Sequence, residues 1–365
     1  MAETKVRYSN IELLRIVAIF LVMVAHCNIW LGGGLPDATD GMTVMFWGKH
    51  VIASLSSICV VLFVLISGYF TIKPNLKSVI TLWTQIFFVY LYVFIIQTIA
   101  TGGGINYKSL ILCFLPFTVG NWFVKSYLIL MLLSPALNLM TDKLSRKGML
   151  LFLMLLSIIA LLWGCIINDP AAGFNKGYSP LSFVYFYMVG RYLRLYSIND
   201  KSKWFYFGSY LLLSLVLFVG LFAKQMWMLY YCNPILVLSA ASLFMFFVKW
   251  DIGHVGFVNW VASSVFAVFI FHTKEPVVGW LKSYNIQKLN TLPYFEYLCL
   301  MFVVLIAIFM VAILMDKIRG YIFKPIIIYV SRIEILSNNS EKLISIKKNE
   351  SIFIPRTGDT EGGNG

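Results

Sequence analysis

Three ionisable side chains lie on one face of the first long apolar segment of the chain. Glu12, Arg15 and His26 are the only ionisable residues within positions 12–26. In an α-helix, the eleven residues from Arg15 to His26 make about three turns at about 100° each, so the two side chains share a face, and Glu12 joins them. Polar groups inside lipid are costly, so this alignment indicates a buried working face that does chemistry or transport in the membrane.

The chemistry open to this face is proton exchange combined with the binding of negative charge. Histidine has an unperturbed pKa of about 6.5 and accepts a proton near neutrality, and Glu12 can hold the Arg15 guanidinium through a charge-assisted hydrogen bond. At 1.5 Å per residue, Arg15 and His26 lie about 16 Å apart along the axis, so they can line one pathway without touching the same atom. The alternative is that these side chains lie at the membrane interfaces. Glu12 and Arg15 would then form a pair near the headgroups, and His26 would be hydrogen-bonded to a neighbour at the other end of the span.

The composition places this face in an all-helical, polytopic membrane protein. Of 365 residues, 60% are hydrophobic and 12% are charged, whereas an ordinary soluble domain has about 25% charged residues. One transmembrane domain is expected over residues 1–330, followed by a polar tail, 331–365, that we predict to be disordered. We predict about ten membrane spans of about 20 residues, at 9–30, 51–70, 79–100, 122–140, 148–167, 179–196, 204–223, 229–248, 260–281 and 296–316. Lys274, Glu275 and Pro276 interrupt the ninth span.

The net charge of +13 is a topology signal rather than a sign of nucleic-acid binding. Lysine and arginine are concentrated in alternate connections and in the tail from Lys317 onward, so the positive-inside rule places both termini in the cytoplasm. The six cysteines are scattered, with neither metal-ligand spacing nor a disulfide framework, and we expect no metal. His50 and His254 lie at loop borders and are expected to be solvated.

Further segments along the chain carry motifs in a fixed order. They are residues 62–70, which contain Ser67-Gly68-Tyr69, and then 121–138, 186–193 and 268–272. Together with the Arg15–His26 spacing, these segments resemble the membrane acyltransferase 3 family, bacterial enzymes that acylate cell-surface carbohydrates. Residues 121–138 look like the fourth helix of the branch that modifies capsule, O-antigen or exopolysaccharide.

At one place the chain departs from the family pattern. Many members carry an Arg-x-x-Arg pair just after the Ser-Gly-Tyr segment, where it is thought to help hold the acyl donor. Residues 71–84 contain no arginine here, and Lys73 and Lys77 are the only cations. A lysine lacks the bidentate fork of arginine, so phosphate binding by these two would be less directional. Either the donor is held elsewhere or Lys73 and Lys77 hold it.

The resemblance implies a membrane O-acyltransferase, most often an O-acetyltransferase, of the bacterial inner membrane. Such an enzyme moves an acyl group from cytosolic acetyl-CoA to a hydroxyl of a surface polysaccharide or its lipid-linked precursor. The reaction needs a base for the hydroxyl proton, donors for the tetrahedral oxyanion and a basic site for the nucleotide phosphates. We assign His26 as catalytic base or acyl-relay residue and place Arg15, held by Glu12, near the donor, which predicts acyl transfer across the bilayer.

Five further residues are candidates for contact with the substrate. Trp122 and Tyr127 offer aromatic faces to a sugar, and Asn138 offers an amide that donates and accepts hydrogen bonds. Lys125 could meet an acidic sugar, and His272 belongs to an intramembrane polar cluster. Three alternatives remain: Trp122 as an interfacial anchor, Lys125 reaching outward, and His272 as a hydrogen bond between helices.

Two other classes of function stay open. A polysaccharide or lipid-linked sugar transporter would also need many spans and buried charges, but transporters often show internal repeats, and residues 1–165 and 166–330 show none that is convincing. A sensor or scaffold derived from an acyltransferase is the other open class, because the arginine pair is missing. Labelling of glycan from acyl-CoA by the purified protein in vesicles supports the enzyme, whereas flux without labelling supports the transporter.

Overall fold

The computed structural model describes residues 8–102, 104–115, 121–196 and 201–352, with side chains up to residue 334. Within these ranges all regular secondary structure is helical, which confirms the predicted class. Residues 353–365, the end of the predicted tail, lie outside the described part. The α-helices are α1 Ser9–Ala25, α2 Val44–Ser56, α3 Cys59–Phe70, α4 Leu76–Thr101, α5 Tyr107–Phe114, α6 Trp122–Lys143, α7 Arg146–Ile159, α8 Pro180–Tyr196, α9 Lys203–Phe222, α10 Pro234–Lys249, α11 Gly256–Ala262, α12 Val265–His272, α13 Val277–Thr291 and α14 Tyr294–Ile352.

Each predicted apolar segment overlaps one or more helices. Within the described residues, eight helices are long and apolar enough to cross a membrane, or nine if the bent pair Gly256–His272 and Val277–Thr291 counts as one span. The sixth predicted span corresponds to α8, whose 17 residues rise only about 25 Å against a hydrocarbon core of about 30 Å. The membrane class is thus confirmed, whereas the described residues hold eight or nine candidate spans and do not confirm the count of about ten.

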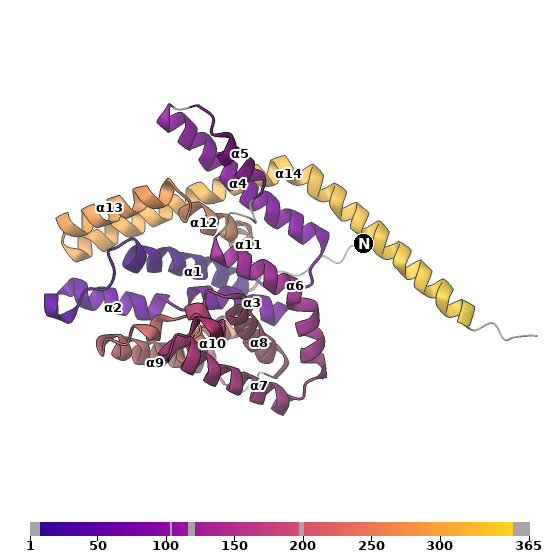
Figure 1. Cartoon of the computed structure of the whole chain (residues 1–365), viewed down its shortest axis with the longest axis horizontal. Coiled ribbons are helices and arrows are strands. Elements are labelled where there is room, and N and C mark those ends of the chain that lie inside the picture. Colours follow the sequence, from indigo (N-terminus) through magenta and orange to yellow (C-terminus); the bar gives the residue numbers. More distant parts are fainter. Residues whose placement is uncertain (1–7, 103, 116–120, 197–200, 353–365) are drawn as a thin grey trace, which may run out of the picture.

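Helix α1 lies inside the bundle (Figure 1), where it contacts α3, α11 and α12. Its buried positions include Leu14, Ala18 and Val22, which flank the line from Arg15 to His26 at helical spacing. Arg15 and His26 themselves remain partly exposed on this otherwise buried face. The face that carries the ionisable groups therefore points into the protein, while both groups remain partly accessible.

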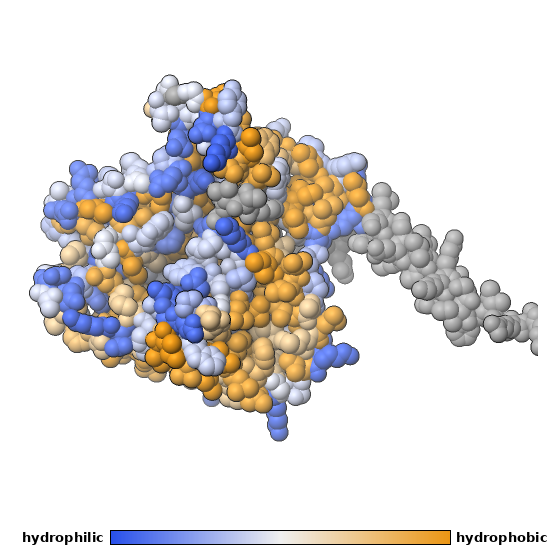
Figure 2. Space-filling view, viewed as in Figure 1, coloured by the Kyte–Doolittle hydropathy of each residue, from blue (hydrophilic) through white to orange (hydrophobic). Residues whose placement is uncertain are grey.

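The surface is divided by hydropathy. Apolar residues cover much of the visible face, and hydrophilic residues gather at the end of the bundle where α13 lies (Figure 2). Helix α14 runs without a break from Tyr294 to Ile352. It therefore continues helical backbone past residue 330 into the first part of the segment predicted as a tail.

A close approach of two helix backbones fixes α3 against α8. A Cβ atom on Gly68 would lie 2.2 Å from the carbonyl oxygen of Tyr187 and 3.1 Å from the Cα atom of Gly190. No side-chain movement relieves an overlap with backbone, so the two helices can pack this closely only with glycine at the contact.

We expect Gly68→Ala to lower the free energy of unfolding by about 1–3 kcal/mol or more, because the added methyl group must push the helices apart. Gly208→Ala on α9 is the matched control, since a Cβ atom there meets nothing within 4 Å. Thermal unfolding of the purified variants in one detergent measures the difference. Equal melting temperatures for the two variants would contradict this account of the packing.

Candidate active site

The helix that carries His26 changes its winding at that residue. Helix α1 passes directly into a π-helical turn, η1, His26–Trp30, and the amide of Leu31 donates to the carbonyl oxygen of His26 at 2.7 Å. Single π-helical turns inside α-helices are rare and occur frequently at functional sites. The wider turn places the His26 and Trp30 rings edge to face, with centroids 5.2 Å apart.

Buried polar side chains hold this turn in place. Asn28 donates to the carbonyl oxygen of Lys49 at 2.8 Å, and the Lys49 ammonium donates to the carbonyls of Gly32 at 2.6 Å and Gly34 at 2.9 Å. Asn285 on α13 donates to the carbonyl of Cys27 at 2.7 Å. Because buried carbonyls need such partners, these contacts fix residues 27–34 and therefore the position of His26.

A cavity of about 860 Å³ lies beside His26. Its wall combines aromatic rings with a few polar and charged groups, as expected for a site that binds a small polar molecule. Its lining includes His26, Trp30, Trp122, Tyr178, Tyr231 and Lys274. Trp122 thus lies on the cavity wall, and its role in substrate binding stays a prediction.

A break between α12 and α13 forms one side of the cavity. The axes of Gly256–His272 and Val277–Thr291 are bent by 77°, and Thr273, Lys274 and Glu275 in the break all line the cavity. The Lys274 ammonium lies 3.9 Å from the centroid of the Tyr90 ring, within cation–π range. The interruption in the ninth apolar segment is therefore a wall of the site.

Three aromatic rings gather on another side. The Trp122 centroid lies 4.5 Å from that of Tyr178 and 6.2 Å from that of Tyr231. Burial raises the pKa of the Tyr178 phenol, so its hydroxyl group stays protonated and can donate a hydrogen bond. Aromatic faces beside a polar group suit the apolar face and the hydroxyl groups of a sugar ring.

His26 contacts a second histidine. His26 Nδ1 lies 3.0 Å from His272 Nε2, and His272 Nδ1 lies 2.8 Å from the carbonyl oxygen of Val268. The His272 side chain is completely buried and lies behind His26, away from the cavity wall. Of the two positions considered for His272, the structure has the hydrogen bond between helices.

The opposite end of α1 holds an ion pair. Arg15 Nη1 lies 3.1 Å from Glu12 Oε1, and the Arg15 side chain keeps 37% of its exposure whereas that of Glu12 keeps 10%. The contact between Glu12 and Arg15 expected from their spacing is present. Arg15 is not a lining residue of the His26 cavity, so a continuous pathway between the two residues stays a prediction.

Comparison with known protein families decides the class. A family model described as an acyltransferase domain matches residues 8–317, which cover the whole candidate site and most of the chain. The protein belongs to the acyltransferase 3 family. The comparisons with curated proteins and with solved structures gave no match. Membrane acyl transfer is therefore the protein's class of activity.

The predicted donor-site lysines of the acyltransferase lie at the Arg15 end of the bundle. Lys73 and Lys77, in the connection after α3 and in the first turn of α4, are both exposed. The Arg194 guanidinium of α8 lies 5.1 Å from the ring centroid of Tyr69. Arg191, three residues earlier, is buried and donates to the hydroxyl of Thr71. The end of α3 therefore meets two arginines that come from α8.

Asn138 is placed in this second polar cluster and not in the cavity. Its amide donates to the carbonyl of Ile72 at 3.0 Å and accepts from the Tyr187 hydroxyl at 2.6 Å. The same hydroxyl accepts from the amide of Ile72 at 3.2 Å. These bonds hold the chain where it leaves α3, so the contacts made by Asn138 are structural, and its proposed role in substrate binding stays a prediction.

Other candidates occupy different surroundings. The Tyr127 hydroxyl lies 3.1 Å from the Ser67 hydroxyl on α3, and Lys125 is exposed and absent from the cavity lining. His254 is exposed as expected. His50 was expected to be solvated, which is wrong: it is 5% exposed, and its Nδ1 lies 2.8 Å from the carbonyl of Phe46.

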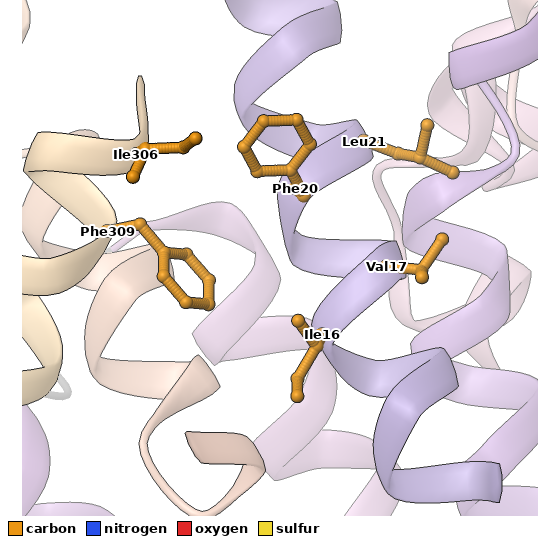
Figure 3. Close-up of a pocket in the computed structure, with 6 residues that line it drawn as sticks. All are labelled: Ile16, Val17, Phe20, Leu21, Ile306 and Phe309. Atoms are coloured by element: carbon orange, nitrogen blue, oxygen red, sulfur yellow. The ribbon is translucent and has the colours of Figure 1, made fainter. Parts of the chain in front are cut away.

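A second, apolar cavity of about 290 Å³ lies between α1 and α14. Figure 3 shows Phe20 of α1 and Phe309 of α14 facing this space, with Ile16 below them. At about 100° per residue, its α1 residues lie roughly 100–240° around the helix from Arg15. This cavity therefore lies on the other side of α1 and offers no polar group to an acyl donor or a sugar.

Proposed function

We propose that the protein is an O-acyltransferase that moves an acyl group, most simply acetyl, from acyl-CoA to a hydroxyl group of a cell-surface polysaccharide or its lipid-linked precursor. The proposal rests on one observation above all: His26 lies on the wall of an aromatic cavity at the end of α1 opposite Arg15. Membership of an acyltransferase family favours group transfer over sugar transport.

The proposed reaction uses His26 as the base. Its free ring nitrogen takes the proton of the acceptor hydroxyl while the hydroxyl oxygen bonds to the thioester carbonyl carbon. The tetrahedral intermediate then collapses, the carbon–sulfur bond breaks, and the proton passes from His26 to the leaving thiolate. The products are a sugar ester and free CoA thiol, so no other reactant is needed.

The two ends of α1 serve different substrates in this proposal. Arg15, Lys73 and Lys77 lie at the end that we assign to the cytoplasm, where the phosphates of the donor would meet cations. Trp122, Tyr178 and Tyr231 lie at the other end, where a glycan would stack on aromatic rings. Their separation supports transfer from a cytosolic donor to an acceptor on the outer side of the inner membrane.

The experiment that tests the function uses purified protein in lipid vesicles. Radiolabelled acetyl-CoA is supplied with a de-esterified envelope glycan from cells that lack the protein. CoA thiol release and label in the glycan are both measured, and glycan flux across the vesicle membrane is followed in parallel. We expect both to rise together with protein concentration. Thiol release without glycan labelling, or glycan flux without either, would refute the proposed transfer.

We expect Trp122→Ala to raise the KM for the glycan about fivefold and to leave kcat within about twofold, because a lost stacking contact costs about 1 kcal/mol. Trp204→Ala is the matched control, since Trp204 is 65% exposed on α9 and lies outside the cavity lining. Steady-state kinetics against the de-esterified glycan measure both constants. A glycan KM unchanged in Trp122→Ala would leave Trp122 as an interfacial anchor only.

A further inference from the structure

We propose that His272 is a positioning residue that fixes the tautomer and the orientation of His26, so that His26 Nε2 faces the cavity without a proton. The inference deepens the proposed function and rests on it for its catalytic meaning. The arrangement of the two rings can nevertheless be tested without any activity. It is carried by the chain of contacts from the carbonyl of Val268 through His272 to His26.

The hydrogen-bonding partners determine which nitrogen carries each proton. A carbonyl oxygen can only accept, so His272 Nδ1, 2.8 Å from the Val268 carbonyl, must carry a proton. In a neutral ring, His272 Nε2 is then an acceptor. His26 Nδ1, 3.0 Å from that nitrogen, must therefore be the donor. A neutral His26 ring with its proton on Nδ1 has its lone pair on Nε2.

Burial favours the neutral form of His272. Its side chain is 0% exposed, and its two ring nitrogens face a backbone carbonyl and another imidazole. An imidazolium in such a place would lose its hydration without gaining a carboxylate partner, which is costly. The alternative arrangement, in which a charged His272 donates to His26 Nδ1, is therefore disfavoured.

His272 is held rigidly enough for this role. It is the last residue of α12, and Val268 lies one turn earlier on the same helix. The edge of its ring packs against Phe269, with centroids 6.0 Å apart. A side chain fixed by a backbone contact and by packing can in turn fix the ring that it touches.

The arrangement also limits what His272 can do. The Val268 carbonyl is not a base, so His272 cannot pass a proton onward and does not relay one. When His26 takes a proton on Nε2, its Nδ1–H bond to His272 becomes charge-assisted and stronger. His272 thus stabilises the protonated state of His26 that forms during transfer, as a third group does for the base in other nucleophile–base pairs.

The first test is spectroscopic. The protein has four histidines, which are labelled with a nitrogen isotope. Nitrogen NMR distinguishes the two neutral tautomers of each ring, and the signals that disappear in His26→Asn are assigned to His26. We expect His26 to be protonated on Nδ1 in the unchanged protein and to shift toward the Nε2 tautomer in His272→Phe. An Nε2-protonated His26 in the unchanged protein, or no shift in His272→Phe, would overturn the proposal.

The second test is kinetic and uses a conservative variant. His272→Phe should lower kcat about 10- to 100-fold, as is typical when a partner that orients an imidazole is lost, with the glycan KM within about twofold. His272→Gln should recover most of this loss, because the glutamine carbonyl can accept from His26 Nδ1. His254→Gln, at an exposed histidine, is the control and should leave kcat unchanged.

The outcomes separate this inference from the proposed function. If His272→Phe and His272→Gln lose activity equally while both remain folded by thermal unfolding, a merely structural role is indicated and the proposal fails. If the unchanged protein does not acylate glycan, the proposed function fails, but the NMR measurement still decides how the two rings share their protons.

Discussion

Replacing His26 with alanine should lower acyl transfer to glycan by at least about 100-fold, because a positioned general base contributes about 10²- to 10⁴-fold to such reactions. The ring lies on the cavity wall and has its other nitrogen committed to His272. Label in the de-esterified glycan, measured in vesicles with radiolabelled acetyl-CoA, quantifies the loss. Full activity of this variant would remove His26 from the reaction.

A second variant guards against loss of structure. Removing the ring leaves His272 Nε2 buried without its donor, which costs about 1–3 kcal/mol. His26→Asn retains an amide N–H near the position of Nδ1, so it can still donate to His272, but it offers no base. Both variants should therefore be equally inactive, and only the alanine variant should lose stability.

The same vesicles distinguish a base from an acyl relay. If His26 carries the acyl group, radiolabelled acetyl-CoA without glycan should label the protein, and His26→Ala should not be labelled. If His26 acts only as a base, the protein stays unlabelled and CoA thiol release requires glycan. Either result leaves His26 in the reaction and fixes its role.

The sequence predicted the inward face of α1 because helical geometry is local. An eleven-residue spacing aligns Arg15 with His26 wherever the helix lies, and the cost of polar groups in lipid determines that the face is turned inward. Lys274, Glu275 and Pro276 likewise indicated a break in the ninth span. What the sequence could not provide was the consequence of that break, since the cavity wall forms only when α12 meets α1.

The roles of residues that depend on long-range packing could not be predicted in the same way. His272 is 246 positions from His26, and Asn138 is 66 positions from Ile72, so no local pattern links either pair. Tyr178 and Tyr231 were missed because they come from connections between helices. Tyr178 stands just before the predicted span 179–196 and Tyr231 inside the predicted span 229–248, where aromatic residues are also typical of interfacial anchors.

Changing Arg15 to lysine should raise the KM for acetyl-CoA about 10-fold or more, because lysine keeps the charge but loses the planar fork that binds phosphate through two bonds. Glu12 is only 8% exposed, so removing the Arg15 charge outright would leave a buried carboxylate unpaired at a cost of several kcal/mol. The lysine variant avoids that cost, since its ammonium can still pair with Glu12. CoA thiol release at varied acetyl-CoA concentrations measures the effect.

Two comparisons separate donor binding from a purely structural ion pair. Arg146→Lys is the matched control, because Arg146 is exposed at the start of α7, and it should leave the acetyl-CoA KM unchanged. The double variant Glu12→Gln with Arg15→Met removes both charges together and should fold. If the pair serves only the fold, this variant and Arg15→Lys should both keep the normal KM. If Arg15 binds the donor, the double variant should show the larger increase of the two, because it has neither the fork nor the charge.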